Sequence, residues 1–156
     1  MRKFEKISIN EYDKSLKELC NYEDIIIPTR STKNSAGYDF ISPISFELGI
    51  GESKKIPTGI KASMNEDEFL SIVIRSSLGF KYNIRLCNQV GIVDSDYYNN
   101  ENNEGHIYIK IKNEGEETLV INKGDRFAQG IFMKYLLVDD DSSNNERKGG
   151  FGSTGN

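Results

Sequence analysis

The residues best suited to chemistry stand in one short stretch, residues 91–97, which reads Gly-Ile-Val-Asp-Ser-Asp-Tyr. An apolar run breaks there into two carboxylates, a hydroxyl and an aromatic ring. Asp94 directly follows a predicted buried strand end, where a carboxylate is partly desolvated and held by its neighbours, as a general base requires. A strand that ends in an Asp-Ser-Asp turn fits the same residues, because short polar side chains cap their own backbone. The rest of the chain must decide between these interpretations.

Length, charge and hydropathy limit the class of protein. The 156 residues are about one domain. A net charge of -4 and a pI near 5.1 argue against the basic stripe of a duplex-binding surface, so we expect no nucleic-acid partner. No segment approaches the ~18 apolar residues of a membrane span, and the first ten residues lack the apolar region of a signal peptide. We therefore expect a soluble, cytoplasmic protein with no membrane contact.

The cysteines and the single histidine offer little for metal or nucleophilic chemistry. Cys20 and Cys87 are too few for a disulfide framework and match no metal-ligand spacing, so we expect reduced thiols. His106 stands beside a polar loop and is predicted to lie on the surface rather than to activate a nucleophile. Because the net charge is negative, any anionic ligand must be held by a few lysine or arginine side chains close to its site.

The elements that must position Asp94 are mostly short strands. Residues 4–9 alternate like a strand, and Asn10 is a predicted N-cap of one short helix that continues towards Cys20. Residues 24–27 are predicted to be a strand that enters an exposed loop at residues 29–35. The further predicted strands are residues 38–42, 44–48, 53–56, 59–64, 69–74, 106–112, 118–121 and 126–133.

This spacing predicts an all-β fold, a sandwich or barrel of the jelly-roll kind, with a second short helix through Leu78 and Phe80. Ile107, Ile109 and Ile111 alternate with polar residues, a pattern typical of an antiparallel strand with one solvated face. Residues 1–138 are predicted to form the single domain. Residues 98–105 are an Asn-rich exposed excursion, and residues 139–156 form a flexible, acidic and then glycine-rich arm.

Five blocks in sequence order carry a family resemblance. They are residues 36–40 (AGYDF), 75–79 (RSSLG), 91–97 (GIVDSDY), 124–129 (GDRFAQ) and 149–155 (GGFGSTG). Together they resemble the trimeric dUTPase family, of the bacterial or phage type. The resemblance implies a jelly-roll subunit, a homotrimer with shared active sites, and Mg²⁺-dependent hydrolysis of dUTP to dUMP and pyrophosphate, which keeps uracil out of DNA.

The resemblance also implies roles for individual residues. Asp94 would be catalytic and would activate the water that attacks the α-phosphorus. Tyr97 would pack on the deoxyribose and exclude a 2'-hydroxyl, and Asn88 on its hairpin would recognise uracil. Asp39 and Arg126 would support the site or the metal's surroundings, while Mg²⁺ sits mainly on the substrate phosphates without a direct protein ligand. The implied substrate-binding set is Arg75, Ser76, Ser77, Asn88, Gly91, Val93, Tyr97, Gln129, Arg147, Phe151, Gly152 and Ser153.

The chain departs from the family pattern at two places. Ser77 stands where the family usually has Gly, which adds a Cβ near the phosphates. In the fifth block the family's Arg lies five residues before the Phe, but Glu146 holds that position here. Either Arg147 or Lys148 takes over the role from a shifted register, or the C-terminal lid over the substrate is weaker.

Two other functions remain open. A dCTP deaminase shares the fold but needs a different acid-base residue and normally lacks the Gly-Phe-Gly lid. Phage-type dUTPases are also candidates for binding a repressor protein, and residues 98–105 offer a surface for such a partner.

Overall fold

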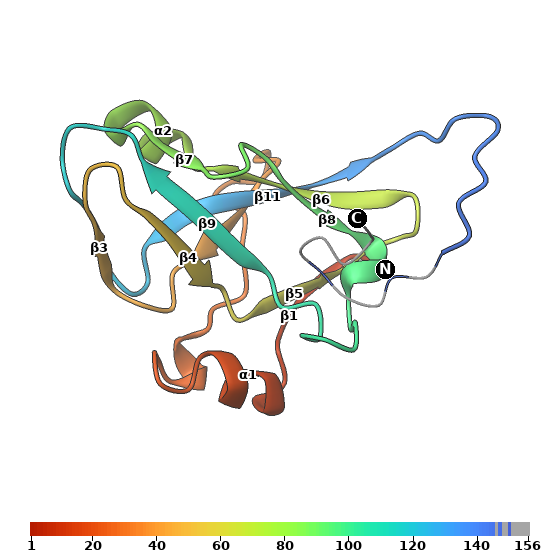
Figure 1. Ribbon diagram of the computed structural model, residues 1–156, viewed down its shortest axis with the longest axis horizontal. Coiled ribbons are helices and arrows are strands. Elements are labelled where there is room, and N and C mark those ends of the chain that lie inside the picture. Colours follow the sequence, from red (N-terminus) through yellow and green to blue (C-terminus); the bar gives the residue numbers. More distant parts are fainter. Residues whose placement is uncertain (146, 148–149, 151–156) are drawn as a thin grey trace.

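The computed structural model describes residues 1–145, 147 and 150. The predictions for Phe151, Gly152 and Ser153, and the register question at Lys148, lie outside these residues. The described chain consists of short antiparallel strands with two short α-helices, which confirms the predicted all-β class (Figure 1). The strands are β1 (Lys3–Lys6), β2 (Tyr38–Ile41), β3 (Phe46–Leu48), β4 (Ser53–Pro57), β5 (Ile60–Ser63), β6 (Glu68–Ile74), β7 (Ile84–Leu86), β8 (Gly91–Asp94), β9 (Tyr108–Asn113), β10 (Leu119–Ile121) and β11 (Arg126–Lys134).

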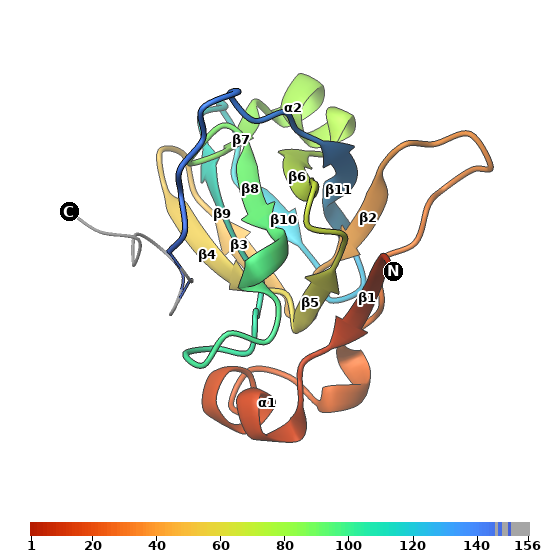
Figure 2. The same ribbon diagram turned by 90° about the vertical axis from the view of Figure 1, so that its right-hand side faces the viewer.

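Two sheets enclose the core. One has the strand order β2-β11-β6-β8 and the other β4-β9-β7, and the pairs β1-β5 and β3-β10 complete the body. Figure 2 shows these two sheets side by side, with the N-terminal helical region below them. On β9 the side chains of Ile109 and Ile111 are buried while Lys110 is exposed, so the predicted alternation is confirmed.

The helices end and begin at sequence signals. Helix α1 (Ile9–Ser15) is capped by Ser8, whose Oγ accepts a hydrogen bond from Glu11 N, so the predicted N-cap at Asn10 is wrong by two residues. Helix α2 (Ser76–Tyr82) starts after Arg75 and ends at Asn83, which adopts the left-handed conformation common at helix C-termini. Among the described residues, no helix has the length and apolar character needed to cross a membrane.

The predicted strand at residues 24–27 is wrong. The 3-10 helix η1 (Tyr22–Asp24) occupies its start, and the chain then runs on without a ladder partner. Ile25 is buried, whereas Ile26 and Ile27 are exposed, and Pro28 has no backbone N–H to donate to a sheet. Strand β7, in contrast, is present but was not predicted.

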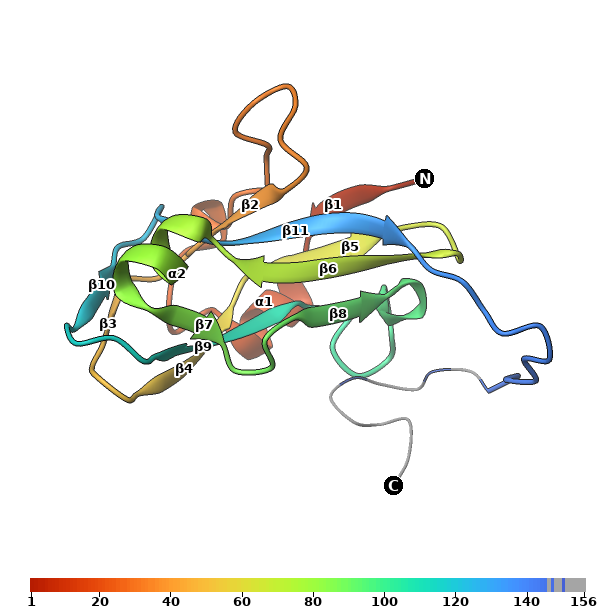
Figure 3. The ribbon, with the colours of Figure 1, turned by 90° about the horizontal axis from the view of Figure 1, so that it is seen from above.

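Strand β6 separates two regions of the molecule that matter for the site. Asp94, the last residue of β8, lies opposite Phe69 at the beginning of β6. Helix α2 begins after the other end of β6, as Figures 1 and 3 show. Strand β11 ends at Lys134, opposite Glu68, so the C-terminal segment leaves the sheet on the Asp94 side.

Candidate functional site

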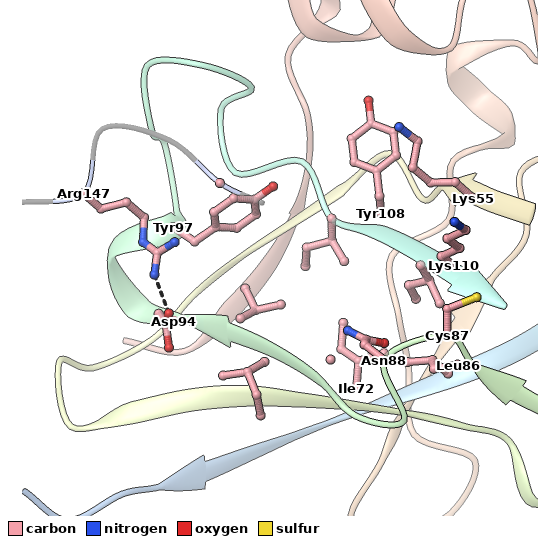
Figure 4. A pocket seen from close by; sticks show the side chains of 16 residues that line it. Lys55, Ile72, Leu86, Cys87, Asn88, Asp94, Tyr97, Tyr108, Lys110 and Arg147 are labelled. Atoms are coloured by element: carbon pink, nitrogen blue, oxygen red, sulfur yellow. Dashed lines mark hydrogen bonds and ion pairs between the residues drawn. The ribbon is translucent and has the colours of Figure 1, made fainter. Parts of the chain in front are cut away.

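A pocket of about 640 Å³ lies beside β8 (Figure 4). Asn88, Gly91, Val93, Asp94 and Tyr97 all line it, so the structure brings these predicted site residues together. The fully buried side chains of Ile107 and Ile109 add an apolar wall. One concave, largely apolar site with a few polar groups is the usual form of a small-molecule pocket.

Asp94 stands where strand β8 becomes the 3-10 helix η2 (Ser95–Tyr97). Its side chain is 48% exposed, so it is held by the strand end but remains open to water. The turn interpretation is therefore correct for the backbone, since Asp94 is the N-cap residue of η2, but its side chain makes no capping hydrogen bond. The carboxylate is left for other partners.

Arg147 is the partner of this carboxylate. Its Nη2 donates to Asp94 Oδ2, and its Nε donates to Asp96 Oδ1 over 2.7 Å. Figure 4 shows the guanidinium above Asp94, next to the ring of Tyr97. The arm of the same chain thus contacts the pocket, and Gly150 lies so close to Tyr97 that a Cβ there would be 2.5 Å from Cε2. Asp96, the second carboxylate of residues 91–97, was given no role from the sequence; it does not line the pocket but holds Arg147 there.

Tyr97 forms part of the pocket wall and is itself only 8% exposed. Its hydroxyl donates to the carbonyl oxygen of His106 over 2.9 Å. Burial raises the pKa of this phenol, and a hydrogen bond from Asn103 partly opposes that shift. The ring is therefore a neutral and rigid surface.

A second polar cluster surrounds Asp39, which is 6% exposed. Its Oδ1 lies 3.4 Å from Arg75 Nε, and its Oδ2 lies 3.4 Å from Arg126 Nη1 and accepts a hydrogen bond of 2.6 Å from Ser31 Oγ. Arg126 also donates to Ser31 Oγ over 3.0 Å. These contacts hold two guanidinium groups next to each other, with one carboxylate to offset their charge.

Gly37 of the first block lies against Gln129 of the fourth block. Gln129 lies opposite both Asp39 and Val73 in the sheet, so it belongs to the Asp39 cluster. A Cβ at Gly37 would lie 2.2 Å from Gln129 Oε1. A side chain at position 37 would therefore force this amide to move, a constraint that was not recognised from the sequence.

Ser76 and Ser77 are exposed in the first turn of α2, next to Arg75. Asn88 is exposed on the hairpin between β7 and β8, where Gln89 adopts a left-handed conformation. The structure therefore divides the predicted site residues into two groups. Asn88, Gly91, Val93, Asp94, Tyr97 and Arg147 lie at the pocket, whereas Asp39, Arg75, Ser76, Ser77, Arg126 and Gln129 lie towards the α2 end of β6.

The pocket also contains residues that were not predicted. Lys55, Cys87, Tyr108 and Lys110 line its far side. Lys55 and Lys110 lie directly opposite each other on β4 and β9, and Lys55 Nζ lies 5.0 Å from the centroid of the Tyr108 ring. The predicted solvated face of β9 was the available signal, but the sequence alone does not place that face beside β8.

The predicted surface position of His106 is wrong, because this residue is fully buried. Its Nε2 accepts a hydrogen bond of 2.9 Å from Gly59 N, and its ring packs 4.2 Å from that of Tyr108. Burial lowers the pKa of His106 to about 4. The imidazole is therefore neutral near pH 7 and supports the pocket from behind.

No group of three His, Cys, Asp or Glu side chains that could hold a metal ion occurs within residues 1–145, 147 and 150. Asp94 and Asp96 share one guanidinium, and both oxygens of Asp39 already face cations. Cys20 and Cys87 are free thiols, as predicted.

Known proteins share both the sequence and the fold. The dUTPase family profile matches residues 23–155. The deoxyuridine 5'-triphosphate nucleotidohydrolase of Lactococcus lactis subsp. lactis (strain IL1403) is 48% identical over 133 residues, which cover 84% of this chain and 89% of that relative. The same enzyme of Laribacter hongkongensis (strain HLHK9) is 37% identical over 136 residues, covering 82% and 87%.

Solved structures agree. The crystal structure of dUTPase from Streptococcus mutans superimposes with a TM-score of 0.72 at 39% identity, and the match covers 88% of this chain and 98% of that one. The dUTPase from phage phi11 of S. aureus gives 0.69 at 20% identity over 93% and 97%, a likeness of fold. The five blocks, the pocket at β8 and these matches lead to one conclusion: the chain belongs to the dUTPase family, the deoxyuridine 5'-triphosphate nucleotidohydrolases.

Proposed function

We propose that this chain hydrolyses dUTP to dUMP and pyrophosphate, with Asp94 as the general base. The observation that carries this proposal is the position of Asp94 in the pocket lining, near the ring of Tyr97 and at the opposite end of β8 from the hairpin of Asn88. Arg147 contacts Oδ2, and among the described residues no side chain holds Oδ1, which could accept a hydrogen bond from a water molecule.

The reaction requires one proton transfer and one displacement. Asp94 takes a proton from the water molecule while the water oxygen forms a bond to the α-phosphorus. The bond between the α-phosphorus and the oxygen that bridges to the β-phosphate then breaks, and its electron pair leaves with pyrophosphate. General-base assistance of this kind contributes ~10²–10⁴-fold in rate.

Uracil and deoxyribose would occupy the pocket beside β8. Asn88 and the hairpin backbone would recognise the edge of uracil, with Gly91 and Val93 beside it. A Cβ at Gly91 would approach Ile72 Cβ to 3.2 Å, so the glycine keeps this wall of the pocket close to β6. The ring of Tyr97 would pack on the sugar and leave no space for a 2'-hydroxyl.

The leaving pyrophosphate would be bound by the second group of residues. Arg75, Ser76 and Gln129 would hold its oxygens, with Ser77 alongside, while Asp39 and Arg126 orient Arg75. Mg²⁺ bound to the triphosphate would neutralise charge on the leaving group, and Asp39 would accept hydrogen bonds from its water ligands.

One chain cannot present both groups to the same triphosphate. Asp94 lies opposite Phe69, and Arg75 follows β6 six residues further on, or about 20 Å at the rise of a β-strand. Adjacent phosphates share a single bridging oxygen and cannot span that separation. We infer that Arg75 and its neighbours come from a second copy, in a homotrimer with shared sites.

Exposed apolar side chains support this assembly. Ile92 on the edge strand β8 is 56% exposed, Phe80 on α2 is 95% exposed and Leu136 is 97% exposed. Contact with further copies would remove such apolar surface from water, which is favourable. We assign residues 1–138 to the body of the enzyme and residues 139–156 to the arm, which brings Arg147 to the pocket.

A panel of nucleotides tests the activity. Purified protein with Mg²⁺ should release pyrophosphate from dUTP, but not from dCTP, dTTP or UTP at comparable rates. Conversion of dCTP to dUTP without pyrophosphate would instead identify a deaminase, and no consumption of dUTP would contradict the proposal.

The repressor hypothesis remains a prediction. Within residues 98–105, Asn99, Glu101 and Asn102 are exposed and could contact a partner protein. Loss of repressor binding on substitution of these three residues, with dUTP turnover retained, would support it. A cytoplasmic location is also proposed, and the two free thiols are consistent with a reducing compartment.

A further inference from the structure

Residues 98–105 form a folded loop rather than the fully exposed excursion expected from their composition. Glu104 accepts hydrogen bonds from Ser8 N and Ser8 Oγ and pairs with Lys61 over 2.5 Å. Lys61 also donates to Asn99 Oδ1 over 2.8 Å. The loop is therefore fastened to the N-terminal segment at one side, while its other side faces Tyr97.

Asn103 is the residue of this loop that contacts the Tyr97 side chain. Its Nδ2 donates to Tyr97 Oη over 2.7 Å and to the His106 carbonyl oxygen over 3.3 Å. Its Oδ1 accepts from Asn100 Nδ2 over 2.8 Å and from Gly105 N over 3.2 Å. All four hydrogen-bonding positions of the amide are used, so a flipped amide would place donors against donors.

Asn100 holds the other end of the same arrangement. Its Nδ2 also donates to the Tyr97 carbonyl oxygen over 2.8 Å, while its Oδ1 accepts from the backbone N–H groups of Asn102 and Asn103. The backbone of Tyr97 and the tip of its ring are thus held by two linked amides. A ring anchored at both ends cannot turn about its side-chain torsions without breaking hydrogen bonds.

We propose that Asn103 is a positioning residue for sugar discrimination: by holding the Tyr97 hydroxyl it keeps the ring against the deoxyribose and closed to a 2'-hydroxyl. This inference rests on the proposed function of Tyr97. It gives the Asn-rich loop a role in the enzyme itself, because the loop supplies the amide that fixes the wall of the pocket.

The test compares Asn103→Leu with Asn102→Ala. Asn102 lies in the same loop with its side chain exposed, so it is the matched control. Pyrophosphate release gives kcat/KM for dUTP and for UTP. In Asn103→Leu the ratio of these values should fall about tenfold, equal to about 1.4 kcal/mol of discrimination, and in Asn102→Ala it should not change. An unchanged ratio in folded Asn103→Leu would overturn the inference.

A second variant guards against a folding defect. Tyr97→Phe keeps the ring but removes the hydroxyl, which Asn103 holds and which also donates to the His106 carbonyl oxygen, so it should lose at least as much discrimination as Asn103→Leu. The double variant should lose no more than Tyr97→Phe alone, since Tyr97→Phe already breaks the Asn103–Tyr97 contact on which the inference depends. Full discrimination in Tyr97→Phe, or additive losses, would contradict the role of Asn103.

A further variant, Tyr97→Ala, tests separately whether the deoxyribose packs on Tyr97. If Tyr97→Ala keeps the wild-type preference for dUTP over UTP, the sugar does not pack on this ring and the assigned role of Tyr97 is wrong. If Tyr97→Ala loses the preference while Asn103→Leu and Tyr97→Phe retain it, only the positioning role of Asn103 fails.

Discussion

The imidazole of His106 is held in its neutral form by its surroundings. Gly59 N–H donates to Nε2, and Nδ1, which lies 3.6 Å from Glu11 Oε1, has no hydrogen-bond partner in the described chain. Burial lowers the pKa of His106 from 6.5 to about 4. Burial also raises the pKa of Glu11, and the charge of Glu104 opposes part of the His106 shift.

This histidine should make the protein less stable in mild acid. Below pH 6.5 the unfolded chain is protonated at His106, whereas the folded chain is not protonated there until about pH 4. The free energy of unfolding therefore falls between these two pH values. The loss between pH 7 and pH 5 should be about 2 kcal/mol. Glu11 acts in the opposite direction, because its raised pKa favours the folded state as pH falls.

Urea unfolding of wild type and His106→Gln at a fixed protein concentration isolates the effect. Gln cannot titrate, and Glu11 is present in both proteins. The difference in unfolding free energy between the two should shrink by about 2 kcal/mol from pH 7 to pH 5. A difference that is the same at both pH values would mean that His106 does not resist protonation.

Arg147 is the cation that contacts Asp94, the proposed general base. In its proposed role Arg147 would also bind the nucleotide, and a hydrogen bond from a charged group contributes about 1.5–3 kcal/mol, so Arg147→Gln should lower kcat/KM for dUTP at least about tenfold. Arg147→Lys keeps the charge but not the fork that reaches Asp94 and Asp96, and should be intermediate. Wild-type kcat/KM in Arg147→Gln would contradict a role of Arg147 in binding dUTP.

At the scale of elements, two lysines with like charge face each other on the paired strands β4 and β9. Lys55 and Lys110 are directly opposite, and neither has an ion pair with a described carboxylate. Like charges in this position destabilise a strand pair. Strand β9 lies between β4 and β7, so protection of a sheet edge does not account for Lys110.

Lys110→Glu should therefore stabilise the protein by about 0.2–1 kcal/mol. Lys33→Glu changes the net charge equally but lies in an exposed loop, and it should have little effect. Thermal unfolding at low salt compares the two. Equal shifts in both variants would show that net charge, and not the cross-strand pair, is responsible.

Several elements could be predicted because their signals are local. The alternation of Ile107, Ile109 and Ile111 identified a half-buried strand, and the break from Val93 to Asp94 marked the site. The wrong elements depended on distant partners. Residues 24–27 are as apolar as a strand but meet no ladder, and His106 follows a polar loop yet is covered by α1 and Tyr108.

The whole molecule matters because its two groups of site residues lie at opposite ends of β6. The order of the five blocks along the sequence does not show how far apart they lie in one chain. The register of β6 with β8 and β11 shows that separation. The proposed shared site rests on this separation and on the large apolar side chains that a single chain leaves exposed.

Complementation tests the shared site. Arg75→Ala and Asp94→Asn should each be inactive alone. When the two are unfolded together and refolded as mixed trimers, about one quarter of the sites should combine an intact Asp94 with an intact Arg75 from another copy. Activity that stays absent in the mixture would indicate a site built within one chain.

The central claim is that Asp94 activates the attacking water. In Asp94→Asn the side chain keeps its shape but cannot take the proton, so kcat for dUTP should fall by ~10²–10⁴-fold while the KM and the melting temperature stay close to wild type. Wild-type turnover of dUTP by the folded Asp94→Asn protein would contradict the account.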